Sequence, residues 1–305
     1  MLPTVPTIKT AARLRLAQVA LLAPILALIP PPLTAAPPGP LPFGVYDPQG
    51  DFISDPEVSI EHVFMPWEDV SLSSLLEADL YALERNRALL ITVEPWTWTR
   101  DERNTANFLR RGIDAGYYDA NMRSICNVIA TLQSPVSVRW GHEMETDDGQ
   151  FIWSAWNPAD YIRAYRRMID VCRAAAPDIN VVWSPIGLEN ANDYYPGDDY
   201  VDLVGLSIFG LEAWEIEILG GALSFDEILE ERYNRVKVHG KPVLVAELGY
   251  SGKADYVDLW EGQVRKQRPE MPLLVGAAYF NQPEVYEWPD GFGLPDWRID
   301  QRVLP

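Results

Sequence analysis

Two short segments of the chain each end an apolar run with a glutamate. Residues 139–144 read Arg-Trp-Gly-His-Glu-Met and contain Glu143, and residues 243–249 read Val-Leu-Val-Ala-Glu-Leu-Gly and contain Glu247. Apolar and β-branched runs of this length predict buried strands, so each strand would deliver a carboxylate at its carboxyl end. A buried carboxylate is costly without a partner, and two of them beside aromatic residues favour a chemical role.

The elements that must hold these carboxylates alternate along the chain. Eight short apolar runs predict strands, and amphipathic stretches between them predict helices, which is the pattern of a parallel sheet covered by helices. The expected fold is α/β, a single (β/α)8 TIM barrel that the last strand closes. The strands are expected at Phe43 to Tyr46, Glu61 to Met65, Leu89 to Val93, Val136 to Trp140, Val181 to Ser184, Leu203 to Ile208, Val243 to Ala246 and Leu274 to Tyr279, and the helices at Leu72 to Arg87, Tyr117 to Gln133, Pro158 to Ala175, Phe225 to His239 and Ala254 to Arg268.

The carboxyl ends of barrel strands carry the reactive groups in this fold, and Glu94, Glu143, Phe209, Glu247 and Asn281 fall there. Cleavage of a glycosidic bond with retention needs one protonated carboxyl and one ionised carboxylate about 5 to 5.5 Å apart. The sequence therefore predicts that Glu143 and Glu247 form such a pair. The simpler alternative is that both are salt-bridge partners in the core.

Arg139 is expected beneath this pair. Alternation along the fourth strand places it on the same barrel-facing side as Glu143 but deeper in the barrel. Its charge would favour the ionised form of a neighbouring carboxylate, and Glu247 is the expected beneficiary. The alternative is that Arg139 only neutralises Glu94 or another acid of the barrel.

The chain resembles glycoside hydrolase family 26, the β-mannanase family of a barrel clan with its acid/base on strand four and its nucleophile on strand seven. The resemblance runs from about Phe43 to Asp300. It implies a retaining β-glycosidase of the endo-1,4-β-mannosidase or related β-glucanase type, with Glu143 as acid/base, Glu247 as nucleophile and His142 placing the substrate. The segments that carry it are Glu94-Pro95-Trp96, residues 139–144, Trp183-Ser184-Pro185, residues 200–206 and Ala246-Glu247.

Two features depart from the family pattern. Residues 145–149 are a longer, acidic segment where the family has Asn-Gly, and Phe209 stands where the family commonly has a tyrosine that contacts the nucleophile. Phenylalanine cannot donate that hydrogen bond, so Arg139 or Tyr279 is expected to donate to Glu247 instead. Mixed-linkage β-glucan and a bacterial exopolysaccharide thus stand beside mannan as candidate substrates.

The chain contains eleven tryptophans, and several follow predicted strands. Flat aromatic faces on barrel loops stack on pyranose rings, although core packing is the alternative for each residue. Trp288 and Trp297 are expected beside the cleavage point. The predicted substrate-binding residues are His142, Glu94, Trp96, Trp153, Phe209, Tyr279, Asn281, Trp288 and Trp297.

Residues 1–36 have the layout of a secretory signal peptide. Three basic residues precede an apolar run from Leu16 to Pro30, and small residues follow. The run is shorter than the ~20 residues of a membrane span and is interrupted by prolines, so a membrane anchor is the less favoured alternative. We expect a Pro-rich lead-in at 37–42 and one catalytic domain at 43–305, secreted or periplasmic and without stable membrane association.

Composition narrows the choice of partners and cofactors. The formal net charge of −19 disfavours nucleic acid and polyanions and favours a neutral β-linked polysaccharide. Cys126 and Cys172 lie on apolar stripes of neighbouring predicted helices, where they form either a disulfide or two buried thiols. The three histidines lack metal-ligand spacing, so no metal and no cofactor is expected. We expect a monomer.

Two other kinds of function stay open at this stage. A non-catalytic carbohydrate-binding barrel is favoured only by Phe209. Transglycosylation, or processing of an exopolysaccharide, would follow if a sugar hydroxyl instead of water captures the covalent intermediate.

Overall fold

The computed structural model describes residues 34–68, 70–96, 105–146, 149–154 and 156–305. The chain divides into units 1–31 and 32–305, and the described residues belong to the second unit. Nearly all of the predicted signal peptide, including its apolar run, lies outside the described residues. Among the described residues, none of the helices is both long enough and apolar enough to cross a membrane.

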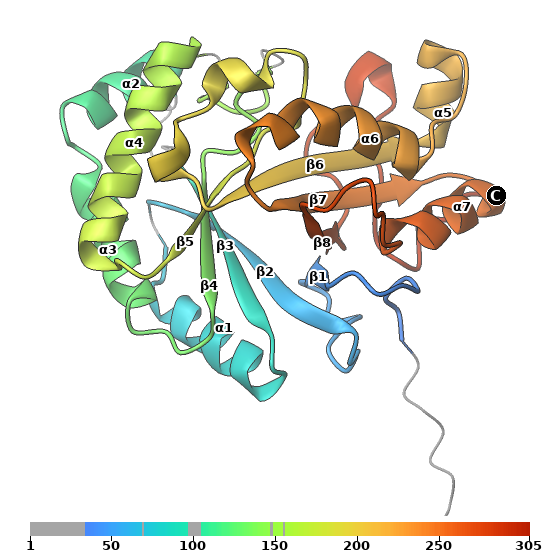
Figure 1. Ribbon diagram of the computed structural model, residues 1–305, viewed down its shortest axis with the longest axis horizontal. Coiled ribbons are helices and arrows are strands. Elements are labelled where there is room, and N and C mark those ends of the chain that lie inside the picture. The colour runs from blue at the N-terminus through green and yellow to red at the C-terminus, as the bar shows by residue number, and fades with distance from the viewer. Residues whose placement is uncertain (1–33, 69, 97–104, 147–148, 155) are drawn as a thin grey trace, which may run out of the picture. The chain divides into compact units, whose positions relative to one another are not determined.

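Eight parallel strands close into a barrel in the order in which they occur in the chain, and β1 pairs with β8 (Figure 1). This confirms the predicted (β/α)8 fold. The strands are β1 (Phe43–Tyr46), β2 (Val58–Pro66), β3 (Ala88–Glu94), β4 (Val136–Trp140), β5 (Asn180–Trp183), β6 (Leu203–Leu211), β7 (Val243–Ser251) and β8 (Leu274–Phe280).

Helices cover the outside of the barrel, with α2, α3 and α4 gathered on one side (Figure 1). The helix α4 begins where predicted because Asn157 caps it, accepting from the backbone N–H of Asp160 at 3.0 Å. The helix α2 and the short elements after β6 were not predicted. The helices are α1 (Ser73–Glu84), α2 (Ala106–Asp114), α3 (Asp119–Ile129), α4 (Pro158–Ala175), α5 (Glu212–Trp214), α6 (Phe225–Val236) and α7 (Ala254–Val264), and the short turns are η2 (Ala191–Tyr194), η3 (Asp198–Tyr200), η4 (Glu215–Leu219), η5 (Lys237–His239) and η6 (Pro289–Gly291).

Apolar side chains fill one layer of the barrel interior. Leu90 of β3, Val182 of β5 and Leu244 of β7 form a buried cluster of their own inside the barrel. Alternate strands contribute such layers in this fold.

β6 and β7 run further than the sequence predicted. The predicted ends were Ile208 and Ala246, whereas the strands continue to Leu211 and Ser251. Gly249 permits the extension because a Cβ there would lie 2.8 Å from the ring of Phe209. Glu247 consequently lies within β7 and not just beyond its end.

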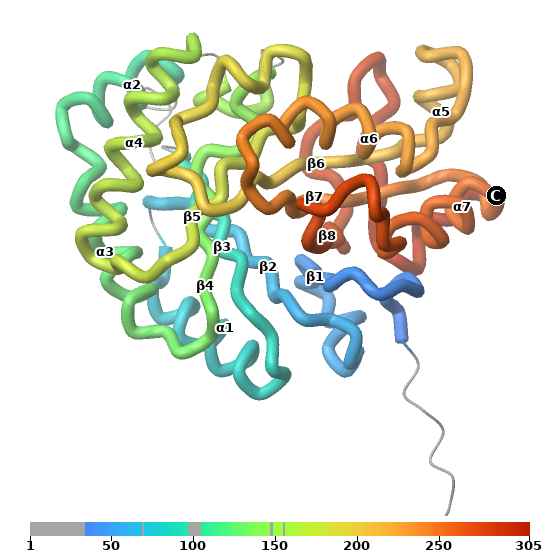
Figure 2. The backbone as a smooth tube through the Cα atoms, viewed as in Figure 1, coloured from blue at the N-terminus to red at the C-terminus, as the bar shows by residue number. Residues whose placement is uncertain are grey.

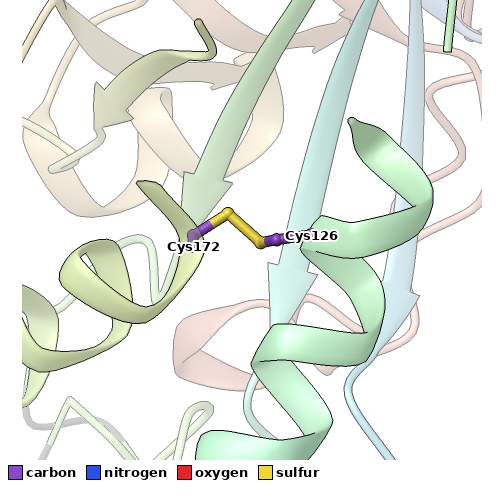
Figure 3. The surroundings of a disulfide bond; sticks show 2 residues. All are labelled: Cys126 and Cys172. Carbon is purple, nitrogen blue, oxygen red and sulfur yellow. A yellow bond between two sulfur atoms is a disulfide. The ribbon is translucent and has the colours of Figure 1, made fainter. Parts of the chain in front are cut away.

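A disulfide between Cys126 and Cys172 joins α3 to α4 (Figure 3). The Cα atoms are 5.2 Å apart, and both residues are fully buried. Of the two alternatives that the sequence left open, the structure shows the disulfide. It closes a segment of 46 residues that contains β4 and the loop after it.

The C-terminal residues return to the barrel beside α7, as the tube in Figure 2 shows. Val303 forms a parallel bridge with Gly252, just after β7, and the N–H of Leu304 donates to the carbonyl of Gly252 at 2.7 Å. The chain beyond β8 is thus fixed against the strand that carries Glu247.

Candidate active site

A cavity of about 580 Å³ opens at the carboxyl ends of the strands. Tyr46, Glu94 and Phe280, the last residues of β1, β3 and β8, all line it. Other lining residues include Phe64, His142, Glu143, Gln150, Phe151, Ile186, Leu188, Ser207, Phe209, Trp214, Arg232, Glu247, Glu284, Tyr286, Glu287 and Trp288.

Glu143 is placed by a sharp change of backbone direction after β4. The strand ends at Trp140, and Gly141 and Glu143 both have a positive φ, of 53° and 54°. The N–H of Glu143 donates to the carbonyl of Ser184 at 2.8 Å. Left-handed backbone at a residue other than glycine costs on the order of 1–3 kcal/mol and persists where the surroundings impose it, which is common at functional sites. Simple alternation along the strand therefore does not describe the position of Glu143.

Glu247 is placed by irregular pairing on both sides of β7. On β6 the register passes from Leu206 opposite Val245 to Ser207 opposite Glu247, and on β8 it also shifts between Val245 and Leu248. Such bulges redirect side chains at the rims of barrels. The side chain of Glu247 thereby points into the cavity with 8% of its surface exposed.

The two glutamates lie close together beside a histidine. One side-chain atom from each of His142, Glu143 and Glu247 lies within 4.8 Å of the other two, and Nε2 of His142 is 3.7 Å from Oε1 of Glu247. A separation of this size between carboxylate oxygens fits the spacing of retaining glycosidases, since an inverting pair leaves room for a water molecule.

Arg139 lies beneath both carboxylates and is fully buried. Its Nη1 donates to Oε1 of Glu247, and its Nη2 is 4.0 Å from Oε1 of Glu143. The hydroxyls of Thr92 and Ser207 accept further bonds from it at 3.3 and 3.4 Å. Arg139 thus contacts Glu247 as the sequence predicted. The other expected donor, Tyr279, instead donates to the carbonyl of Trp297 at 2.6 Å.

The environments of the two carboxyls differ. Burial raises the pKa of Glu143, and the charge of Glu247 raises it further. Burial also raises the pKa of Glu247, but the charge and hydrogen bond of Arg139 oppose that change. Of the two carboxyls, only that of Glu247 accepts a hydrogen bond from Arg139, so Glu143 is the member of the pair that keeps its proton.

Glu94 is a third buried acid beside the pair. Burial and the charge of Glu247 raise its pKa to about 7, against a lowering hydrogen bond from the side chain of Trp96. His142 stays neutral, because burial and the charge of Arg139 hold its pKa well below the ordinary value. At neutral pH the cavity therefore contains a protonated carboxyl, that of Glu143, an ionised carboxylate, that of Glu247, and a carboxyl whose pKa is about 7, that of Glu94.

The same three side chains, His142, Glu143 and Glu247, form a group that could hold a metal ion. Arg139 already places a fixed positive charge against Glu247 and near Glu143. A cation at this position would meet that charge at close range. These three side chains are therefore better suited to binding a sugar and transferring a proton than to binding a metal ion.

The predicted substrate-binding residues fall into two groups. His142, Glu94, Phe209 and Trp288 line the cavity. Trp96, Trp153, Tyr279, Asn281 and Trp297 are buried and are not among its lining residues, so the structure does not show them in position for direct contact with a sugar.

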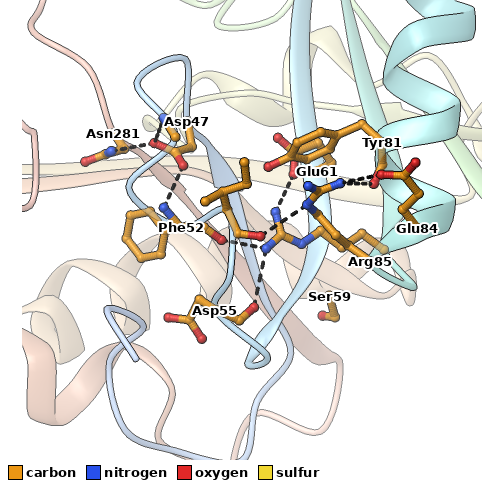
Figure 4. Close-up of polar contacts among 12 residues, drawn as sticks. Asp47, Phe52, Asp55, Ser59, Glu61, Tyr81, Glu84, Arg85 and Asn281 are labelled. Atoms are coloured by element: carbon orange, nitrogen blue, oxygen red, sulfur yellow. Dashed lines mark hydrogen bonds and ion pairs between the residues drawn. The ribbon is translucent and has the colours of Figure 1, made fainter. Parts of the chain in front are cut away.

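The buried residues support the cavity wall. Nε1 of Trp153 donates to the carbonyl of His142 at 2.6 Å, and Nε1 of Trp297 donates to Glu284 at 3.2 Å. The Nδ2 atom of Asn281 donates to Asp47 at 2.7 Å (Figure 4). It also donates to Asp51 at 2.8 Å, and the two bonds join the end of β8 to the loop after β1.

Glu145, the first residue of the acidic segment 145–149, is also structural. It is buried and accepts from the backbone N–H groups of Gly187 and Leu188 at 2.7 and 3.3 Å. This fixes the loop after β5 against the loop after β4. Residues 147 and 148 of the segment lie outside the described residues.

Sequence reasoning missed several lining residues. Tyr46 ends a predicted strand, so the rule that found Glu94 would have found it too. Ser207 sits at the β6 bulge, forms a hydrogen bond with Glu143, and gives no sequence signal. Arg232 reaches from α6 to the carbonyl of Ser207, and Tyr286 lies in the loop after β8.

A (β/α)8 barrel with two buried glutamates at this spacing, one of them paired with an arginine, defines a glycoside hydrolase. Residues 113–285 match the family described as Glycosyl hydrolase family 26, and the chain belongs to that family. Glu143 and Glu247 both lie in the matched part, whereas Glu94 precedes it.

Two known proteins are similar in sequence to part of this chain. It is 24% identical to Endoglucanase H of Acetivibrio thermocellus over 251 residues, which are 76% of this chain and 26% of that protein. It is 26% identical to a Beta-1,3-xylanase of Alcaligenes sp over 144 residues, or 45% of this chain and 28% of that protein. The chain therefore matches about a quarter of the length of these relatives.

Solved structures share the fold. A modular endo-beta-1,4-mannanase from Cellulomonas fimi superposes with a TM-score of 0.61 at 14% identity, over 88% of this chain and 67% of that chain. A GH26 beta-mannanase from Bacteroides ovatus gives a TM-score of 0.57 at 18% identity, over 79% and 80%. At these identities the likeness concerns the barrel alone.

Proposed function

We propose that the protein is a retaining β-glycosidase that hydrolyses a neutral polysaccharide. The observation that carries the proposal is the pair of glutamates with one carboxylate oxygen of each within 4.8 Å of the other, with Arg139 donating to only one of them. Family membership supports hydrolysis of glycosidic bonds. The assignment of roles to individual residues rests on the geometry.

In the first step Glu247 attacks the anomeric carbon and Glu143 gives its proton to the leaving oxygen. Arg139 keeps Glu247 ionised, and burial keeps Glu143 protonated. The sugar is then bound covalently to Glu247. His142 lies 3.7 Å from Glu247, close enough to contact the sugar next to the reacting carbon.

In the second step Glu143, now ionised, takes a proton from water, which attacks the anomeric carbon and releases Glu247. The negative charge that Glu247 carried is lost in the covalent intermediate, and with it one cause of the raised pKa of Glu143. The hydroxyl of Ser207, which bonds to Glu143, also favours its ionised form. The same carboxyl can thus act first as an acid and then as a base.

The lining of the cavity supports a neutral substrate. Among the residues that the structure describes, Glu94, Glu247, Glu284 and Glu287 line it beside one cation, Arg232, so anionic sugars would meet net negative charge. We propose a β-linked mannan, glucan or xylan as the substrate class. The names of the mannanase, endoglucanase and β-1,3-xylanase relatives support that range.

We also propose that the protein is exported, secreted or periplasmic, as the N-terminal segment predicts. The disulfide between Cys126 and Cys172 supports this, since such bonds persist mainly in oxidising compartments. The carbohydrate-binding alternative loses its support, because Arg139 supplies the contact to Glu247 that Phe209 cannot make.

The stereochemistry of the first product tests the proposal. Oligosaccharides of β-1,4-mannose, mixed-linkage β-glucose and β-1,3-xylose are incubated with the full chain, and proton NMR follows the product that the enzyme cleaves off. Retention gives the β-anomer first. An α-anomer first would overturn the role of Glu247 as nucleophile, and failure to cleave any of the three would overturn the substrate class.

Azide rescue separates the two roles. With azide and an aryl β-glycoside of the sugar cleaved, Glu247→Ala should give the α-glycosyl azide and Glu143→Ala the β-glycosyl azide. Glu189→Gln changes an exposed glutamate in the loop after β5; it is the matched control and should give neither product. The reverse pairing of variants and azides would exchange the roles of the two residues.

A further inference from the structure

Arg139 is held in place by two hydroxyls as well as by Glu247. Its Nη1 donates to Oε1 of Glu247 and also to Oγ1 of Thr92 at 3.3 Å, so both hydrogens of this nitrogen are used. Its Nη2 donates to Oγ of Ser207 at 3.4 Å. Among the described residues, Nε of Arg139 has no hydrogen-bond partner. Apart from Glu247, the direction of this buried guanidinium therefore depends on hydroxyl groups.

Thr92 lies opposite Arg139 on the neighbouring strand. The two residues are partners in the pairing of β3 with β4, and both are fully buried. Thr92 is not among the described residues that line the cavity. Any effect of Thr92 on the reaction therefore passes through the residues it bonds to and not through contact with a sugar.

His62 holds the hydroxyl of Thr92 from the other side. Phe64 of β2 is the pairing partner of Thr92, and His62 lies two residues earlier on the same face of that strand. Nε2 of His62 is 2.8 Å from Oγ1 of Thr92. Burial and the charge of Arg139 hold the pKa of His62 well below its ordinary value, so its ring is neutral. Because an arginine can only donate, the oxygen of Thr92 accepts from Arg139, which leaves its hydrogen to donate to His62.

The direction of the guanidinium decides which glutamate it favours. Nη2 is 4.0 Å from Oε1 of Glu143, which is too long for a hydrogen bond, whereas Nη1 donates to Glu247. Without the hydroxyl of Thr92, Nη1 would carry an unpaired buried donor, which is costly, and Glu143 is the second carboxylate near it. A guanidinium turned toward Glu143 would make the two carboxyls more alike, although retention needs one protonated and one ionised.

We propose that Thr92, itself held by His62, is a positioning residue that keeps the guanidinium of Arg139 directed at Glu247 and away from Glu143. The inference rests on the proposed function and deepens it, because it gives a cause in the fold for the difference between acid and nucleophile. The neighbouring strands β2, β3 and β4 each supply one side chain to this row of hydrogen bonds, which ends on β7.

Replacing Thr92 leaves the charged groups around Arg139 in place, since threonine is uncharged. Among the described residues, those that interact with the charge of Arg139 are His62 of β2, Glu94 of β3, His142 and Glu143 after β4, Tyr161 of α4 and Glu247 of β7. Glu145 and Arg232 also interact with Glu143, and Glu284 interacts with Glu247. A changed titration of the two glutamates in Thr92→Val therefore reports the direction of the guanidinium.

An NMR titration of isotopically labelled glutamate carboxyls tests the proposal without a substrate. The signals of Glu143 and Glu247 in the full chain are assigned from the spectra of Glu143→Gln and Glu247→Gln. Thr92→Val should lower the pKa of Glu143 and raise that of Glu247, and Thr92→Ser, which keeps the hydroxyl, should titrate as the wild type does. His62→Leu should move both pKa values in the same directions by less, and should add nothing to Thr92→Val.

Kinetics on the oligosaccharide that the wild type cleaves give a second readout. Thr92→Val should lower kcat about tenfold and leave KM unchanged, because it weakens a bond to a charged group and contacts no sugar. Its pH profile of kcat/KM should narrow from both sides, since Glu247 must be ionised and Glu143 protonated. Ser251→Ala is the matched control: it removes a buried hydroxyl of β7 that donates to the carbonyl of Arg302 at 3.1 Å, and it should lower stability without changing the profile.

Unchanged titrations of both glutamates in Thr92→Val, or a Thr92→Ser variant that behaves like the valine variant, would overturn the positioning role and leave hydrolysis intact. Where Thr92→Val does not fold, unchanged titrations in His62→Leu would overturn it instead. Absence of cleavage by the wild type would overturn the proposed function, and the titrations would still decide which glutamate Arg139 favours.

Discussion

Glu94 allows a direct measurement of how much stability the protein loses by keeping a buried carboxyl group in the cavity. Its pKa is raised from 4.5 to about 7, first by burial and then by the charge of Glu247. Between these values the folded protein holds a proton that the unfolded chain has released, so stability falls as pH rises through this window. The difference corresponds to at most about 3 kcal/mol of stability, which is fully present below pH 4.5 and fully lost above the folded-state pKa.

Glu94→Gln removes this charge while its side-chain oxygen can still accept from Trp96. We expect the free energy of unfolding of the variant, measured with urea, to exceed that of the wild type by up to about 3 kcal/mol more at pH 8 than at pH 4. A constant difference between the two proteins at both pH values would come from packing or the Trp96 bond. That result would refute the idea that Glu94 is held in an unfavourable ionised state, and Glu189→Gln should show no pH-dependent gain.

Three further predictions follow from the site and its frame. Glu143→Gln should lower kcat by several orders of magnitude without lowering the melting temperature, because Glu143 serves the transition state, whereas Glu247→Ala should lower kcat as strongly and also lower the melting temperature, because it removes the partner of the buried Arg139; a folded variant that keeps its activity would contradict this. Replacing Cys126 and Cys172 by alanine should cost about 2–5 kcal/mol of stability by urea unfolding and leave the kcat of the folded protein unchanged. Phe209→Tyr should change kcat/KM by less than about tenfold, since Arg139 already donates to Glu247; a larger gain would show that a donor was missing.

The strands that hold this site could be predicted from the sequence because they are buried on both faces. Continuous apolar runs located all eight strands to within a few residues, and β1 and β4 were predicted at their observed bounds. Glu143 and Glu247 stood out because each interrupts such a run with a charge. The same contrast found Arg139, whose charge has a partner only if a carboxylate lies nearby.

The tryptophans could not be sorted in this way. Trp153 and Trp288 both follow strands and both carry one N–H donor, but Trp153 is fully buried with its donor on the carbonyl of His142, whereas Trp288 lines the cavity. Which face of an aromatic ring is covered depends on loops folding over it. That information lies in contacts between distant segments and not in local periodicity.

The positions of the reacting atoms come from departures from regular structure. A regular strand through Gly141 would carry Glu143 onward by alternation, and a regular β7 would keep Glu247 in register with β6; instead two left-handed residues and two register shifts bring the carboxylates together over Arg139. The alternation of residue types along a strand does not reveal such irregularities, because a bulge changes the direction of a side chain without changing its residue type. The sequence therefore identifies the chemical groups, while the bulges set the distance on which the proposed retention of configuration depends.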